Sequence, residues 1–358
     1  MLELINVSRR VGAEDHIIDV SLQLQRGSIN VLLGPTLAGK TSLMRLMAGL
    51  DAPTSGKVVM DGKDVTGVPV RKRNVAMVYQ QFINYPTLTV YENIASPMRV
   101  AGRPKAEIDA AVKKAADLLQ MTPYLGRTPL NLSGGQQQRT ALARALVKNA
   151  DVVLLDEPLA NLDYKLREEL REELPKIFAE TGAIFVYATT EPHEALLLGG
   201  QTATLSKGRV TQFGETTAVY RRPADLLTAT TFSDPPLNVL AAEKRGQRFS
   251  GAGGVDFAAA PAHAGLGDGR YRIGVRPHRL ELGTTHAAGF DARVTLTEVT
   301  GSETYIHATH VGTDIIALVH GVRRVDAGDT VHLSFDPAEI LVFGEDGSAV
   351  AAPAAMAA

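Results

Sequence analysis

A glycine-rich segment at residues 34–42 holds the residue types that bind phosphate groups. It fits the pattern G-x-x-x-x-G-K-[ST], in which backbone N–H groups surround phosphate oxygens, the lysine reaches the terminal phosphates and the next hydroxyl binds Mg²⁺. A strand is predicted before it, at residues 29–33, and a helix after it, at residues 42–50, as this chemistry requires. A plain glycine-rich turn with a solvated lysine is the less favoured interpretation. The residues expected to hold a polyphosphate are Gly34, Pro35, Thr36, Leu37, Ala38, Gly39, Lys40, Thr41 and Ser42.

Two acidic residues follow a second hydrophobic run, within residues 152–158. Asp156 ends a predicted strand that would lie beside the phosphate-binding loop, so its carboxylate could bind Mg²⁺ together with Thr41. Glu157 is placed to orient or deprotonate an attacking water. Asp-Glu-Pro after a strand is usually just a turn, but the two motifs in this order favour a hydrolytic phosphate site.

A third motif, Leu-Ser-Gly-Gly-Gln at residues 132–136, opens a predicted helix over residues 137–148. The Ser133 hydroxyl, the bare backbone of Gly134 and Gly135, and Gln136 would form a second anion-binding helix terminus. An ordinary serine N-cap is the alternative, since such caps commonly satisfy first-turn N–H groups. The presence of the other two motifs in the same chain favours anion binding.

The elements that must position these residues alternate between strands and helices. Short apolar runs at residues 29–33, 75–79, 152–155 and 184–188 predict an α/β domain with a largely parallel sheet. Apolar residues at helical spacing predict helices over residues 105–120 and after Asp163, and Pro175 is expected to kink or break the second helix. A hairpin is predicted over residues 202–214, turning at Lys207 and Gly208.

The pattern changes beyond residues 233–238, which are predicted to be a linker. Short alternating segments with glycine-rich breaks then predict strands at residues 271–282, 292–309, 314–319 and 330–343, which a small β-barrel would close. Arg272, Arg276 and Arg279 are expected to be solvated or salt-bridged. The Ala-rich residues 347–358 are expected to be disordered.

Composition excludes several classes of protein. The 358 residues carry 37 basic and 39 acidic side chains and a net charge of −2, so binding of nucleic acid by net charge is not expected. No run approaches the ~18–20 apolar residues of a membrane span. The first residues lack the features of a signal peptide, and export is not expected. The absence of cysteine excludes disulfides, thiol catalysis and zinc–cysteine sites and fits a reducing compartment.

Together these motifs resemble those of ABC transporter ATP-binding subunits, specifically the subunits of bacterial carbohydrate and polyol importers. The resemblance runs from about residue 2 to about residue 344, and includes residues 77–86 at the Q-loop, 161–163 at the D-loop, and 276–277, 301–304 and 335–337. It implies an α/β fold: a P-loop NTPase, the ABC nucleotide-binding domain, at residues 1–234, with a helical subdomain at about residues 82–150. A small all-β OB-type regulatory barrel would follow at residues 235–346, and a disordered tail at residues 347–358.

The resemblance also implies a mechanism and partners. Two such domains would dimerise head to tail around two ATP molecules with Mg²⁺, each ATP contacting one phosphate-binding loop and residues 133–136 of the other subunit. Closure and hydrolysis would drive two membrane permease subunits, served indirectly by an extracytoplasmic solute-binding protein, with this subunit peripheral on the cytoplasmic face of the inner membrane. Gln80 would contact Mg²⁺ and the attacking water, Asp163 would belong to the nucleotide site, and residues 82–91 would receive a permease helix.

Three positions depart from the family pattern. Val11 stands where the family stacks an aromatic residue on adenine, and loss of such a stack is typically about 1–3 kcal/mol. Leu37 replaces a usual glycine; if the backbone there needs positive φ, the leucine costs roughly 1–2 kcal/mol, and otherwise the change is tolerable. Thr190 takes the catalytic position of a switch histidine, whose loss often lowers a rate by ~10²–10⁴-fold.

These three departures would lie on the phosphate-loop side of one site, whereas residues 133–136, which serve the opposite site, look intact. This asymmetry favours a heterodimer in which the chain completes an active site on a different ATPase subunit and hydrolyses ATP slowly at its own. A homodimer with threonine at the switch position, and a non-hydrolysing ATP-sensing structural subunit, are the alternatives. The expected solute is a sugar, polyol or glycerol-type compound, from general likeness alone.

Overall fold

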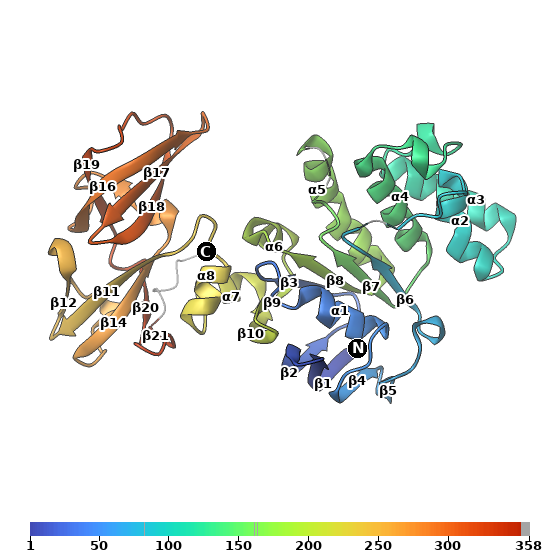
Figure 1. Cartoon of the computed structure of the whole chain (residues 1–358), viewed down its shortest axis with the longest axis horizontal. Coiled ribbons are helices and arrows are strands. Elements are labelled where there is room, and N and C mark those ends of the chain that lie inside the picture. The colour runs from blue at the N-terminus through green and yellow to red at the C-terminus, as the bar shows by residue number, and fades with distance from the viewer. Residues whose placement is uncertain (82, 161, 163, 352–358) are drawn as a thin grey trace. The chain divides into compact units, whose positions relative to one another are not determined.

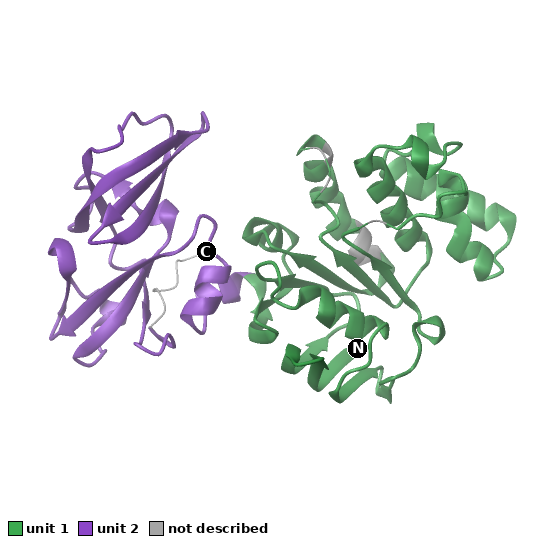
Figure 2. Ribbon diagram, in the orientation of Figure 1, with its two compact units in different colours: residues 1–216 green, residues 217–358 purple. Residues whose placement is uncertain are grey.

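The computed structural model describes residues 1–81, 83–160, 162 and 164–351. The chain forms two compact units, Met1–Thr216 and Thr217–Ala358 (Figure 2). The second unit begins with two short helices, α7 (Thr216–Arg221) and α8 (Leu226–Thr231), which precede the predicted linker at residues 233–238. The expected domain boundary near residue 234 is therefore not the boundary between the compact units.

The first unit is built on a six-stranded sheet with the order β10-β9-β3-β8-β7-β6 (Figure 1). Its strands are β3 (Ile29–Leu33), β6 (Val75–Val78), β7 (Val152–Asp156), β8 (Ile184–Thr189), β9 (Gln201–Ser206) and β10 (Arg209–Glu215). All pairs are parallel except the β9–β10 hairpin. Every residue of β7 and β8 is buried, as expected for parallel strands covered on both faces. The four predicted strands and the predicted hairpin are all present.

A second, antiparallel sheet has the order β2-β1-β4-β5. It consists of β1 (Leu2–Val11), β2 (Glu14–Leu24), β4 (Ser55–Met60) and β5 (Lys63–Asp64). Helix α1 (Lys40–Ala48) shares one apolar core with both sheets: Leu43 and Met44 of α1 belong to the same buried cluster as Leu4 of β1 and Leu154 of β7. This core fixes the helix that follows the phosphate-binding loop.

Three helices lie beyond the β6 edge of the sheet (Figure 1), within residues 82–150, where a helical subdomain is predicted. They are α2 (Val90–Val100), α3 (Lys105–Leu118) and α4 (Gly134–Val147), and each contacts the other two. No helix among the described residues is long and apolar enough to cross a membrane.

Helix α5 (Tyr164–Thr181) continues through Pro175, so the expected break does not occur. A proline inside a helix costs about 3 kcal/mol because it removes one hydrogen bond and crowds the preceding turn. Leu170 and Leu174 are buried on this helix. Burial of such side chains gives about 1.5–3 kcal/mol each, enough to offset the cost. The short helix α6 (Pro192–Leu198) follows β8.

The second unit contains two antiparallel sheets around one apolar core, with the orders β13-β12-β11-β14-β20-β21 and β15-β19-β16-β17-β18. The strands are β11 (Asn238–Arg245), β12 (Arg248–Gly251), β13 (Asp256–Ala258), β14 (Gly269–Val275), β15 (Glu281–Leu282), β16 (Ala288–Val299), β17 (Glu303–His310), β18 (Thr313–His320), β19 (Thr330–Phe335), β20 (Leu341–Phe343) and β21 (Ala349–Ala351).

Three of the four predicted strands of this unit each cover two observed strands and the segment between them, and the fourth, at residues 314–319, corresponds to β18. The strand expected at residues 271–282 is interrupted at Pro277, which cannot donate to a sheet. The one expected at residues 292–309 turns at Gly301, whose φ is +101°. Strands β11, β12 and β13 were not predicted. The expectation of disorder from residue 347 is wrong for the first part of that tail, because Ala349–Ala351 pairs with β20; residues 352–358 lie outside the described residues.

Asn93 organises the segment that leads into α2, and its replacement tests this role. The buried amide donates to the carbonyls of Tyr85, Leu88 and Thr89 and accepts from the Tyr85 N–H. Asn93→Ala removes the partner of the Tyr85 N–H and of the Leu88 carbonyl, whereas the carbonyls of Tyr85 and Thr89 keep their bonds from the Leu88 and Asn93 N–H groups. We expect the free energy of unfolding in urea to fall by about 2–3 kcal/mol.

Asn131→Ala is the matched control for this prediction. Asn131 is an exposed asparagine of the same subdomain that makes a single side-chain bond, to Thr128. Its replacement should change the free energy of unfolding by less than about 0.5 kcal/mol. Equal losses in the two variants would contradict an organising role for Asn93.

Candidate functional site

The phosphate-binding loop joins β3 to α1 and leads into an open helix terminus. The N-cap residue Gly39 has φ +105° and gives no side-chain hydrogen bond to the first turn of α1. First-turn N–H groups and the helix dipole attract anions. A Cβ atom at Gly34 would lie 2.4 Å from the carbonyl oxygen of Leu205 in β9, so the close approach of the loop to the sheet requires glycine.

Lys40 lies folded into this loop, with only 5% of its side chain exposed. Its Nζ donates to the carbonyl oxygens of Gly34 at 2.7 Å and Pro35 at 3.1 Å. The ammonium is also 3.7 Å from Glu157 Oε1. Burial lowers the pKa of Lys40, against the opposing effect of the Glu157 and Asp156 carboxylates. The loop thus carries a buried cation whose present partners are mostly backbone carbonyls.

Thr41 and Asp156 meet as the sequence predicts. The Thr41 hydroxyl donates to Asp156 Oδ2 at 2.7 Å. Asp156 is buried at the end of β7, and this burial raises the pKa of its carboxyl group, although the hydrogen bond from Thr41 and the charge of Lys40 lower it. Hydroxyl and carboxylate oxygens are ligands that Mg²⁺ accepts.

Gln80 and Glu157 form a second pair beside the first. The Gln80 amide donates to Glu157 Oε2 at 2.8 Å. The Glu157 backbone has φ +47°, and its N–H donates to the carbonyl of Ala188 in β8 at 3.0 Å. The side chain of Glu157 is 19% exposed and so remains accessible to water.

These groups line one cavity of about 500 Å³. Its walls are residues 14–16 at the start of β2, residues 36–42 of the loop and helix, Gln80, Glu157, and Lys207 with Gly208. Lys40, Thr41, Gln80 and Glu157 are thus brought together, with Asp156 bonded to Thr41. The catalytic and metal-binding roles given to them remain predictions.

Sequence reasoning missed part of the cavity wall. The predicted turn at Lys207 and Gly208 supports the loop directly: the Gly208 N–H donates to the carbonyl of Ala38 at 2.9 Å, and its own carbonyl accepts from Ile18 at 2.8 Å. Glu14, Asp15 and His16 complete this wall. The glycine at the turn was the available signal, but nothing in the sequence placed that turn against the loop.

The three positions that depart from the family pattern are all at the surface. Leu37 is 95% exposed and has φ +67°, which is the left-handed conformation that the sequence could not decide. The leucine is strained in this conformation. Val11 is 46% exposed and lies opposite Glu14 across the β1–β2 pair. Thr190 is exposed directly after β8.

Residues 133–136 begin helix α4 and do not line this cavity. Ser133 and Gln136 form a reciprocal capping box, with the Ser133 hydroxyl accepting from Gln136 N–H at 3.3 Å. Ser133 and Gly134 are exposed. Ser133 is therefore a helix N-cap, which is the alternative that the sequence offered to anion binding. Because the start of the helix is exposed, anion binding there also stays possible. Asp163 and Phe82 lie outside the described residues.

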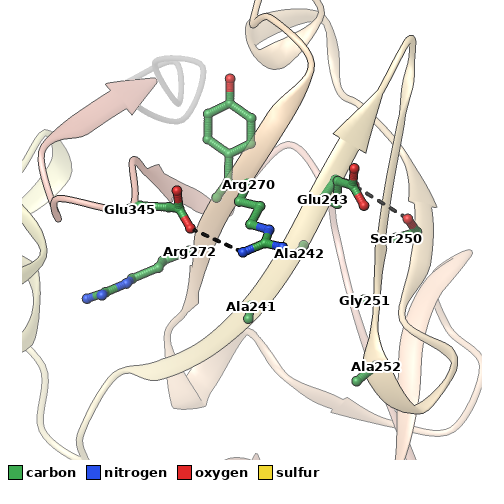
Figure 3. Close-up of a pocket in the computed structure, with 10 residues that line it drawn as sticks. Ala241, Ala242, Glu243, Ser250, Gly251, Ala252, Arg270, Arg272 and Glu345 are labelled. Carbon is green, nitrogen blue, oxygen red and sulfur yellow. Dashed lines mark hydrogen bonds and ion pairs between the residues drawn. The ribbon is translucent and has the colours of Figure 1, made fainter.

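A further cavity of about 590 Å³ lies entirely in the second unit, along β11, β12 and β14 (Figure 3). Arg270 and Glu345 form an ion pair there at 4.0 Å, but they stay 78% and 70% exposed. Mixed charges at such exposure do not select a ligand. Arg279 is salt-bridged to Glu339, as expected, whereas Arg276 packs on the ring of Tyr220.

Comparison with known proteins adds to this geometry. The family model described as ABC transporter matches residues 17–160, and the model described as TOBE domain matches residues 273–343. An alpha-glucoside transport ATP-binding protein of Rhizobium meliloti is 38% identical over 354 residues, which cover 97% of this chain and 98% of that protein. The chain belongs to the ABC transporter ATP-binding proteins.

Other relatives of this ABC protein cover nearly its whole length. An sn-glycerol-3-phosphate import ATP-binding protein of Brucella abortus is 35% identical over 358 residues, covering 97% of this chain and 98% of its own. A xylose/arabinose import ATP-binding protein of Haloferax volcanii is 36% identical over 342 residues, with 93% and 89% covered. The dimeric ATP-binding cassette MJ0796, solved with ADP and Pi, aligns with a TM-score of 0.56 at 28% identity, over 60% of this chain and 99% of that one. The predicted fold class, an α/β P-loop NTPase followed by an OB-type domain, is confirmed.

The strain at Leu37 can be measured. Leu37→Gly should raise the free energy of unfolding of the nucleotide-free ABC protein by up to about 1 kcal/mol, because the roughly 1–2 kcal/mol cost of left-handed leucine exceeds the greater unfolded-state freedom of glycine. Leu130→Gly is the control: Leu130 is 82% exposed in a short right-handed helix. The free energy of unfolding of the Leu130→Gly variant should fall by roughly 0.5–1 kcal/mol. Losses of the same sign in both variants would rule out strain at Leu37.

Proposed function

We propose that this ABC protein uses Mg²⁺-ATP to power the import of a sugar, polyol or glycerol-type solute. The observation that carries the nucleotide chemistry is the convergence of the Thr41–Asp156 and Gln80–Glu157 pairs beside the buried Lys40. The solute class is supported by the relatives, which are named for alpha-glucoside transport, sn-glycerol-3-phosphate import and xylose/arabinose import.

The donor set fits a magnesium ion that is held partly by nucleotide. Thr41, Asp156 and Gln80 offer only oxygen ligands. Among the described residues, no group of three or more His, Asp or Glu side chains could hold a metal ion. Mg²⁺ typically binds through one or two carboxylates plus phosphates and water, which agrees with so few protein ligands. When bound, the ion would neutralise charge on the phosphates.

The other residues would act on phosphate and water. Lys40 would exchange its carbonyl partners for phosphate oxygens, which accept stronger, charge-assisted bonds. Glu157 would orient or deprotonate the attacking water, with Gln80 holding the carboxylate through the amide bond already present. Thr190, exposed at the end of β8, would offer one hydroxyl to the terminal phosphate.

A second ATPase subunit is part of this proposal. Residues 133–136 do not line the cavity formed by the loop of the same chain, so their use requires another subunit. The similar cassette MJ0796 is a dimer in its ADP- and Pi-bound structure, which agrees with such an arrangement. The surface that carries the phosphate-binding loop is weakened by three departures from the family pattern: Val11, Leu37 and Thr190. The surface that serves the opposite site keeps its motif, with a complete capping box at Ser133. This difference favours a heterodimer over a homodimer or a non-hydrolysing sensor.

The membrane partners would be two permease subunits, with the chain peripheral on the cytoplasmic face. Ile83 and Tyr85, in the segment expected to receive a permease helix, are 61% and 52% exposed. Tyr85, Val100 and Arg144 line a cavity of about 340 Å³ between α2, α4 and β6. A solute-binding protein outside the membrane would act only through the permeases.

The asymmetry can be tested in the assembled transporter. Glu157→Gln should lower ATP turnover by less than about 3-fold, whereas the same change at the corresponding glutamate of the second ATPase subunit should lower it by about 10²-fold or more, because only that site is complete. Phosphate release by proteoliposomes is the measurement. Equal losses would point to two equivalent sites, and no loss from either change would remove the hydrolytic role.

The transport role has a separate test in cells. A strain lacking this chain should lose uptake of the solute, and the wild-type chain should restore it. Lys40→Ala should not restore it, because the loop then lacks its cation. The control is Lys105→Ala, which removes an exposed lysine paired with Asp109 on α3. Restoration of uptake by Lys40→Ala would contradict nucleotide-driven transport.

A further inference from the structure

The end of β8 holds parts of the nucleotide site together through backbone hydrogen bonds. The carbonyl of Ala188 accepts from Glu157 N–H at 3.0 Å, and the carbonyl of Thr189 accepts from Gly34 N–H, at the start of the phosphate-binding loop, at 3.3 Å. Thr190 is the next residue. A displacement of this strand end therefore moves the loop, the glutamate and residue 190 together.

Buried side chains anchor the same strand end to α6. The hydroxyls of Thr189 and Tyr187 both donate to Glu194 Oε2, at 2.6 and 3.0 Å. Thr189, Tyr187 and Glu194 are 2%, 1% and 4% exposed. The Thr189 hydroxyl also accepts from Glu191 N–H at 3.0 Å. One buried hydroxyl thus fixes the backbone on both sides of the exposed Thr190.

Arg171 of α5 closes this cluster from the other side. Its Nη2 donates to Glu194 Oε1 at 3.1 Å and to Glu191 Oε2 at 2.9 Å, and its Nη1 is bonded to Glu168. The Arg171 side chain is 8% exposed and that of Glu194 6%, so the pair is buried. Burial and the neighbouring Glu194 carboxylate raise the pKa of Tyr187 well above its ordinary value, which keeps its hydroxyl a donor.

The chemistry of the cluster favours a role in geometry over one in stability. A buried ion pair gains little net free energy, because desolvation of the two charges offsets their attraction. Glu194, Thr189 and Arg171 do not line the nucleotide cavity, so any influence on the site passes through the strand end. Four hydrogen bonds that converge on the Glu194 and Glu191 carboxylates fix that strand end in one position.

We propose that Glu194 is a positioning residue for ATP turnover. Its buried carboxylate, held by Arg171, fixes Thr189 and thereby sets Thr190, Gly34 and Glu157 relative to one another at the terminal-phosphate end of the site. The inference rests on the proposed ATPase function and assigns to it residues that do not touch nucleotide. Misplacement of reacting groups by about 1 Å can cost 10²-fold in rate, so small shifts of this strand end are sufficient.

The first test needs no turnover and no partner subunit. Hydrogen–deuterium exchange of the full chain should become faster at Gly34 and at residues 188–191 in two variants, Glu194→Gln and Thr189→Val. Glu194→Gln leaves one acceptor oxygen where Arg171 on one side and Thr189 with Tyr187 on the other use two, and Thr189→Val removes the hydroxyl itself. Thr189→Ser, which keeps the hydroxyl, should retain most of the protection. Thr202→Val is the matched control, since Thr202 is a fully buried threonine of the same sheet whose hydroxyl is bonded to that of Thr216 at the start of α7.

The second test measures turnover at this chain's own site, with the catalytic glutamate of the second ATPase subunit replaced by glutamine. Glu194→Gln and Thr189→Val should lower kcat by about 10-fold or more and change KM for ATP by less than about 2-fold. Thr189→Ser should restore most of kcat, and Thr202→Val should not lower it.

The outcomes of these tests separate the two proposals. Unchanged exchange at Gly34 and residues 188–191 in Glu194→Gln would overturn the positioning role, as would a loss of kcat that Thr202→Val shares. The wild-type chain could show no turnover at its own site while hydrogen–deuterium exchange becomes faster in Glu194→Gln and Thr189→Val. That result would refute hydrolysis at this site and support the link between Glu194 and the strand end. If turnover is present but kcat is unchanged in Glu194→Gln and Thr189→Val, the positioning role fails and the proposed function stands.

Discussion

Strands β3, β8 and β7 end at one level of the sheet because their parallel pairing sets Leu33 beside Thr189 and Ala188 beside Asp156. Loops that follow the carboxyl ends of parallel strands meet at the same edge, where α/β proteins bind their ligands. The phosphate-binding loop, Glu157 and the residue after β8 therefore come together by backbone pairing alone. The buried cluster around Glu194 then holds the end of β8 and the residues that follow it.

The polar side chains of the site are bonded to one another and to the loop backbone. Lys40 bonds to loop carbonyls, Thr41 to Asp156, and Gln80 to Glu157. Each of these bonds holds a side chain in the cavity wall, in reach of a phosphate or an ion that would compete for it. The left-handed backbone at Leu37 adds strain to the same loop. Strain of this kind persists only where the surrounding fold holds the residue in place, and it concentrates at functional sites.

Much of the fold was predictable because its signals are local. The apolar runs of β3, β6, β7 and β8, the helical spacing of α3 and the turn at Gly208 can be found without knowledge of distant contacts. Predictions failed where tertiary packing overrides local preference. Burial of Leu170 and Leu174 carries α5 through Pro175, and pairing with β20 orders Ala349–Ala351 in a tail that has little to bury.

The sequence by itself determined the family. It also predicted which groups would form the nucleotide site, because Lys40 and Thr41 at a helix start and Asp156 and Glu157 at a strand end require only their immediate neighbours in the chain. Only the tertiary structure decided the backbone at Leu37, the contact of the Gly208 turn with Ala38, and the meeting of Arg171 with Glu194. These features depend on how separate elements pack against the sheet. The spacing of residues along the chain carries no information about such long-range contacts.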